Sequence, residues 1–171
     1  MTTIATETIG EARVLSQQAR AIHGIVRRNV DTLTQKESMV QPQPGGNCLN
    51  WVVGHLVFVY DQVLPMLGQA PVLGTGTLKR YGRGTPQLQN TAEAIDLQEL
   101  MTAWDEAAKR VEAGLETLTA EALDKPASFS PNNDSKETVR SLLSKIFFHQ
   151  AYHAGQTGLL RRIAGKEGAI G

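Results

Sequence analysis

The sequence predicts an all-α protein built as a four-helix bundle. Apolar residues recur at three- and four-residue intervals over four long stretches, which is the spacing of one buried helical face. No stretch of useful length alternates apolar and polar residues as a half-buried strand does. The 171 residues suit a single domain, 1–171, with a core over about residues 8–165 and short flexible termini.

The first helix is expected over about residues 8–33. One apolar stripe follows its length, formed by Leu15, Ala19, Ile22, Val26, Val30 and Leu33. His23 lies beside this stripe and is interpreted as a boundary or surface histidine. Residues 41–46 hold two prolines and two glycines, so they form a loop after the helix.

The second helix begins after Asn47, which is a suitable N-cap, and Pro65 should end or kink it near Leu64. His55 lies on an apolar face of this helix, where a lone histidine is more often a hydrogen-bonded core residue than a metal ligand. Cys48 would sit at the helix N-terminus, which can lower the pKa of a thiol. A lone cysteine is, however, more often a small apolar core residue.

A long connection, from Gly68 to about Asp96, joins the second and third helices and is rich in Gly, Pro and Thr. Such a length is uncommon in a compact domain unless the segment is functional or crosses the bundle. A crossover here would permit an arrangement other than up-down-up-down. Tyr81 and Arg83 lie in this connection, which could fold over a site. Arg83 could pair with a carboxylate of a substrate or cofactor, or be an ordinary loop arginine.

The third helix is expected over about residues 97–118, with Asp96 as its N-cap. A second loop follows over residues 123–133. Asp134 or Ser135 should then cap the fourth helix, which ends near residue 165.

A histidine pair on the fourth helix is the chemical signal around which the chain is organised. His149 and His153 are four residues apart, which places their Cβ atoms about 5–6 Å from each other on one helix face. Two imidazoles so placed can share a metal ion. The face is otherwise apolar, and buried rings without partners would be costly. The pair therefore suggests a metal, or a polar network in its place.

His55 can join this pair only if the second and fourth helices are neighbours in the bundle. Three histidines would leave one coordination position open, as in catalytic rather than structural zinc sites.

Composition and charge exclude several classes of protein. Seventeen basic and seventeen acidic residues give a net charge of zero, without the basic surplus typical of a nucleic-acid binder. The longest mostly apolar run, 49–67, contains His55, Asp61 and Gln62, so it is a poor membrane span. The first seven residues lack the features of a signal peptide, and one cysteine cannot form an intramolecular disulfide. We expect a cytoplasmic protein that binds neither nucleic acid nor membrane.

Two motifs together resemble those of the DinB/YfiT-like bundles. They are Asn50-Trp51-Val52-Val53-Gly54-His55-Leu56 and His149-x-x-x-His153-x-Gly155-Gln156. The likeness extends over about residues 8–165. It implies a divalent metal, most often zinc or nickel, held by His55, His149 and His153, and a homodimer. It also implies kinship with mycothiol-dependent maleylpyruvate isomerases and bacillithiol transferases, in which the metal binds a low-molecular-weight thiol as the thiolate.

The resulting hypothesis is a metal-dependent enzyme, a thiol-dependent S-transferase or a related transferase or hydrolase acting on a small molecule. Tyr81, Arg83 and Gln156 are candidates for binding its cofactor, and no catalytic residue is identified. A zincin protease is excluded because no glutamate follows His149 to act as base. The alternatives are a metal- or ligand-binding bundle without turnover, favoured by the lack of an identifiable acid/base carboxylate, and a purely structural bundle.

Overall fold

Four long helices form the protein, and the computed structural model describes residues 2–170. They are α1 (Thr2–Val30), α3 (Leu49–Val63), α4 (Leu97–Glu116) and α6 (Val139–Ile163). The connections hold shorter helices, namely α2 (Gln35–Ser38), α5 (Ala120–Leu123) and the 3-10 helices η1 (Leu64–Leu67), η2 (Lys79–Tyr81) and η3 (Thr91–Glu93). No strand occurs within residues 2–170. The predicted all-α bundle is confirmed.

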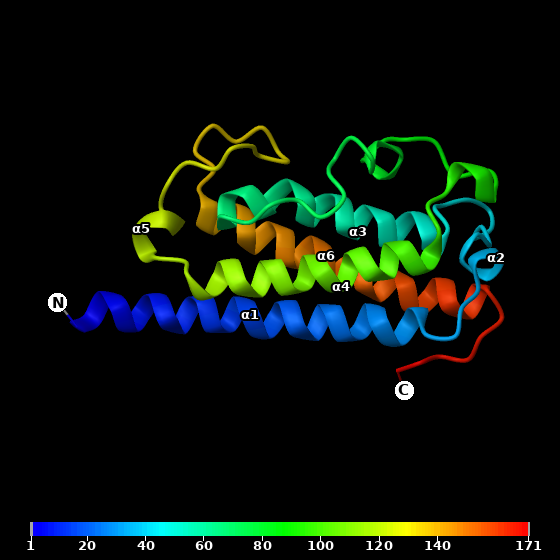
Figure 1. Cartoon of the computed structure of the whole chain (residues 1–171), viewed down its shortest axis with the longest axis horizontal. Coiled ribbons are helices and arrows are strands. Elements are labelled where there is room, and N and C mark those ends of the chain that lie inside the picture. The colour runs from blue at the N-terminus through cyan, green and yellow to red at the C-terminus, as the bar shows by residue number, and fades with distance from the viewer. Residues whose placement is uncertain (1, 171) are drawn as a thin grey trace.

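The long helices pack in a ring in the order α1, α4, α3, α6. In Figure 1, α1 and α6 run in one direction, and α3 and α4 run in the other. Side-chain contacts agree, because Glu11 of α1 pairs with Arg140 at the start of α6, and Asn29 bonds Thr157 towards the other end of both helices. Since α3 and α6 are neighbours, His55 can meet the histidines of the fourth long helix.

The connection between α3 and α4 returns along the bundle, because both helices point the same way (Figure 1). The expected crossover is therefore present. Asp61 of α3 binds the first part of this connection. This buried carboxylate accepts the backbone N–H groups of Val72, Leu73 and Gly74 at 2.7, 3.0 and 2.8 Å.

The start of α6 differs from the expectation. Its N-cap is Thr138, which forms a capping box with Ser141, rather than Asp134 or Ser135. Asp134 instead accepts the N–H of Lys136 at 2.9 Å, so its side chain stabilises a turn before the helix. The helix therefore begins three to four residues later than the sequence suggested.

Other helix ends also differ from the expectation, and α1 begins at Thr2 rather than near residue 8. Cys48, not Asn47, occupies the N-cap position of α3, and its side chain makes no capping bond. The first helix ends at Val30 because Thr32 takes a left-handed φ of 65°. Asp96 caps α4 as expected, accepting the N–H of Gln98 at 2.9 Å.

The core between the helices is apolar and aromatic. Tyr60 of α3 and Trp104 of α4 stack near its centre, with ring centroids 5.1 Å apart and an interplanar angle of 3°. Across residues 2–170, none of the helices combines the length and the apolar character that a membrane span requires.

We expect Asp61→Ala to lower the free energy of unfolding by about 3 kcal/mol, because three N–H groups lose a charged acceptor and each unsatisfied group costs ~1 kcal/mol or more. Urea unfolding measures the change. Asp31→Ala is the matched control, since the exposed Asp31 carboxylate bonds no other described group, and it should change the value by less than about 0.5 kcal/mol. Equal losses in the two variants would contradict the anchoring role of Asp61.

Candidate metal centre

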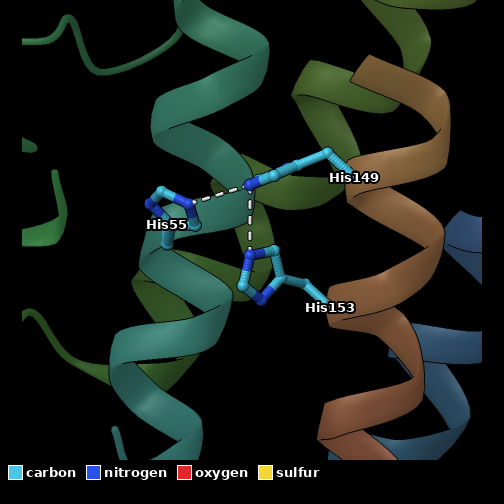
Figure 2. A group of neighbouring side chains, drawn as sticks. All are labelled: His55, His149 and His153. Atoms are coloured by element: carbon cyan, nitrogen blue, oxygen red, sulfur yellow. Dashed lines mark hydrogen bonds between the residues drawn. The ribbon is translucent and has the colours of Figure 1, made fainter. Parts of the chain in front are cut away.

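Three imidazole rings meet between α3 and α6, as Figure 2 shows. His55 comes from α3, and His149 and His153 come from successive turns of α6. The Nε2 atom of His149 lies 3.2 Å from that of His55 and 3.1 Å from that of His153. The structure thus brings together the three histidines that the sequence singled out, although they are up to 98 residues apart (153 − 55).

This spacing fits one shared ion. Two nitrogens bound tetrahedrally to zinc at about 2.0–2.1 Å are about 3.3 Å apart. The observed separations of 3.1 and 3.2 Å are close to that value.

The other ring nitrogens show which tautomer two of the histidines adopt. His55 Nδ1 lies 2.7 Å from the backbone oxygen of Tyr81, and His153 Nδ1 lies 2.6 Å from Oε1 of Gln156. An oxygen acceptor requires the proton on Nδ1, so Nε2 of both rings carries a lone pair. Metal-binding histidines make the same kind of contact through their second nitrogen.

His149 cannot satisfy both neighbours by hydrogen bonding. A neutral ring with its proton on Nε2 donates to one of them at most, which leaves the Nε2 lone pair of the other neighbour without a hydrogen. Its Nδ1 is buried without a partner, and so is Oε1 of the adjacent Gln150, whose amide donates to the backbone oxygen of Leu56 at 3.0 Å. A proton on Nδ1 of His149 would leave three Nε2 lone pairs facing one another. A cation is the group that such a donor set fits.

Burial keeps these rings neutral. It is the largest cause that lowers the pKa of His55 and of His149 to about 4, and it also lowers the pKa of His153. Repulsion from His153 lowers the pKa of the other two rings further. At pH 7 all three are in the neutral form that binds divalent metals.

The motif around His55 builds the wall behind its ring. Trp51 stacks on the imidazole, with ring centroids 4.7 Å apart and an interplanar angle of 15°. Gly54 makes room for the Tyr81 ring, because a Cβ at this position would lie 2.2 Å from Cδ1 of Tyr81. The Tyr81 hydroxyl donates to Oδ1 of Asn50 at 3.0 Å. These contacts hold the Tyr81 carbonyl against His55.

A cavity of about 1260 Å³ opens in front of the three histidines. Its walls come from α3, α6, the long connection and the loop before α6. They carry the aromatic residues Trp51, Phe58, Phe129 and Tyr152 and the cationic residues Lys79, Arg83 and Lys145. Among the residues that the structure describes, no aspartate or glutamate lines this cavity. The centre is therefore open to a small molecule on one side.

The three residues expected to bind a cofactor have different positions. Gln156 lines the cavity and bonds His153, and Arg83 lines the same cavity. Tyr81 does not line it, because its buried hydroxyl also accepts the N–H of Ile95 at 2.7 Å. Its contribution to the centre is its backbone carbonyl.

Two further residues considered from the sequence lie away from the metal centre. Cys48 is buried, which raises the pKa of its thiol, so a nucleophilic role is not supported. His23 is half-buried between α1 and α4, where it bonds Asp105 at 2.8 Å.

Sequence reasoning missed the roles of Gly54, Gln150 and the Tyr81 carbonyl. Gly54 and Gln150 each adjoin a histidine in the chain, and a buried glutamine in an apolar helix is a signal that could have been used. No side-chain pattern marks a backbone carbonyl.

The family model of the DinB superfamily matches residues 19–157, which include both motifs and all three histidines. The chain belongs to the DinB superfamily. The resemblance noted in the sequence is thereby confirmed, and this superfamily match covers most of the four long helices.

A solved structure is similar to this DinB-superfamily protein. The crystal structure of a conserved protein from Enterococcus faecalis has a TM-score of 0.69 and 17% sequence identity, and the match covers 90% of this chain and 97% of that one. At this identity the likeness shows the fold alone. No curated protein matches the sequence.

We expect Gly54→Ala to weaken metal binding about tenfold without removing a ligand, since changes behind a metal-binding histidine typically cost 10–100-fold. The added methyl must displace the Tyr81 ring and with it the acceptor of His55. Chelator competition measures the affinity for zinc, and circular dichroism checks that the helices persist. Gly24→Ala in α1 is the matched control, because a Cβ there meets nothing within 4 Å. An unchanged affinity in Gly54→Ala would show that Tyr81 does not position His55.

Proposed function

We propose that this DinB-superfamily protein binds a divalent ion, zinc or nickel, through His55, His149 and His153. The observation that carries this proposal is the convergence of three neutral Nε2 atoms at the base of a large cavity. Oxygens of Tyr81 and Gln156 fix the rings of His55 and His153, so these ligands are already oriented before a metal arrives.

We further propose that the protein is a metal-dependent transferase for which a low-molecular-weight thiol is the nucleophile. An ion bound by three histidines lowers the pKa of a coordinated thiol or water and supplies a nucleophile near pH 7. The cavity offers a ligand access to the centre from one side, and its aromatic walls keep water from part of the bound molecule. In this proposal the protein acts in the cytoplasm on a small-molecule substrate.

The lack of a carboxylate along the cavity bears on the reaction class. A nearby carboxylate that accepts a proton aids hydrolysis by a coordinated water, and within residues 2–170 no aspartate or glutamate of the cavity wall offers one. A thiol requires less help, because its pKa is much closer to neutrality than that of water. The same lack favours the second candidate, a metal- or ligand-binding protein without turnover.

A second copy of the chain is proposed to pack on the outer face of α6. Phe148, Tyr152 and Leu159 are 76%, 59% and 60% exposed, and their spacing places them on one side of the helix. Gly155 lies between them and leaves room for a neighbouring helix to approach. Because Tyr152 also lines the cavity, such a homodimer would border the mouth of the site.

His153→Ala should abolish stoichiometric metal binding while the protein stays folded, because a bundle with four apolar stripes does not depend on an ion for folding. Elemental analysis of untagged protein and thermal melting test the two halves. His23→Ala is the control and should keep full metal content. Full metal occupancy in His153→Ala would contradict the ligand assignment.

The same samples separate enzyme from binder. Metal-loaded wild type should consume thiol in the presence of a panel of electrophiles, and this activity should be lost in His153→Ala. Metal-loaded wild type that shows neither thiol-dependent nor hydrolytic turnover would favour the binding-protein alternative.

Phe148→Glu should convert the dimer to a monomer, because it places a charge on the face that the second copy would bury. Sedimentation equilibrium measures the mass of the particle. Val40→Glu replaces an exposed apolar residue outside this face and should leave the dimer intact. A wild-type protein that is monomeric at micromolar concentration would contradict the proposal.

A further inference from the structure

The segment of residues 79–85 borders the cavity, and its two arginines differ in the contacts that their side chains make. Arg80 donates to the carbonyl oxygens of Pro86 and Gln87 at 2.6 and 2.9 Å and pairs with Glu93 at 2.8 Å. Arg83, in contrast, makes no side-chain hydrogen bond or ion pair with the described residues, although it lines the cavity beside the histidines.

The backbone on both sides of Arg83 is nevertheless held firmly against α3. On one side the Tyr81 carbonyl accepts the N–H of His55 at 2.7 Å. On the other side Oγ1 of Thr85 accepts the indole N–H of Trp51 at 3.1 Å and donates within its own turn. The backbone of Arg83 therefore has a fixed position, while its guanidinium remains available to bind a ligand. Such positioning reduces the entropy lost when a ligand binds.

The charges around the cavity have one sign. Within the described part of the chain, three cationic residues and no carboxylate line the cavity, although the whole chain has seventeen residues of each sign. Lys145 is neutralised by the buried Glu137 at 2.6 Å, whereas Lys79 and Arg83 have no such partner within residues 2–170. Arg83 lines the same cavity as the three histidines, so its guanidinium can act on a molecule bound there. A cavity with this field attracts anions.

We propose that Arg83, assisted by Lys79, forms a carboxylate-binding subsite next to the three histidines. The inference rests on the proposed function, since it names the chemical class of the molecule that would occupy that site. The planar guanidinium can donate two parallel hydrogen bonds to one carboxylate. Either the thiol or the molecule that accepts its sulfur would carry the carboxylate. In both cases the carboxylate would form the same hydrogen bonds with the Arg83 guanidinium.

The test uses cobalt(II)-substituted protein, in which a thiolate bound to the metal gives a characteristic absorption band. Three small thiols serve as probes: 3-mercaptopropionate, the neutral 2-mercaptoethanol and the cationic cysteamine. In wild type, 3-mercaptopropionate should bind at least about tenfold more tightly than 2-mercaptoethanol, and cysteamine should bind most weakly, because a charged hydrogen bond contributes about tenfold or more. In Arg83→Gln the first two thiols should differ by less than about threefold. Arg28→Gln, an exposed arginine of α1 outside the cavity, should behave as wild type.

A second arm assigns the carboxylate to one molecule. With 2-mercaptoethanol bound, sulfur-free 3-phenylpropionate is added and the cobalt spectrum is followed. Joint binding that Arg83→Gln abolishes would assign the carboxylate to the acceptor of sulfur, and mutually exclusive binding that Arg83→Gln weakens would assign it to the thiol. Both outcomes support the subsite.

Other outcomes overturn specific parts. Equal thiol preferences in wild type and Arg83→Gln, together with an unchanged response to 3-phenylpropionate, would refute the subsite. Inorganic phosphate that displaces the probes as well as a carboxylate does would refute the carboxylate assignment in favour of a general anion site. If no thiol gives the band but 3-phenylpropionate binds in an Arg83-dependent way, the thiol function is wrong and the subsite stands.

Discussion

The hydrogen bond from His55 Nδ1 to the backbone oxygen of Tyr81, 2.7 Å long, joins the two parts of the molecule on which the centre depends. On the helix side it fixes the tautomer of the ring and turns the Nε2 lone pair towards His149 and His153. On the other side it ties the long connection to α3. One contact therefore sets both the geometry of a ligand and the position of the loop that borders the cavity.

Helix direction explains why such a connection exists. Because α3 and α4 run the same way, the chain must return along the bundle between them, as Figure 1 shows. The returning segment lies over α3, where Asp61 fastens its start and Asn50 receives the Tyr81 hydroxyl. A length that looks excessive for a loop is thus required by topology. It also supplies one wall of the site, which a two-residue turn between antiparallel helices would not provide.

The sequence predicts the fold and the histidine cluster well, and the physical reason differs for each. Apolar periodicity reports directly on which helix faces are buried, and a spacing of four residues places His149 beside His153 on any helix. The predicted N-cap of α6 was wrong because Asp134 and Thr138 are both suitable N-cap residues. Asp134 accepts the N–H of Lys136 in a turn before the helix, and Thr138 caps the helix itself. The role of Tyr81 was missed because a backbone carbonyl has the same chemistry at every residue, and only the tertiary structure shows which one meets His55.

The three neutral imidazoles and the cavity around them would not offset the positive charge of a bound divalent ion. Three imidazoles contribute no negative charge, and the cavity adds the cations Arg83 and Lys79, with no carboxylate among its described lining residues. A divalent ion held there would keep its full charge, and it would stabilise the ionised form of a coordinated thiol more than a centre with a carboxylate ligand would. Electrostatics at the metal and along the cavity wall therefore favour the same kind of occupant, an anion that enters by the open face. The proposed reaction class and the proposed ligand class both rest on one property of the cavity, whose walls carry no carboxylate within residues 2–170.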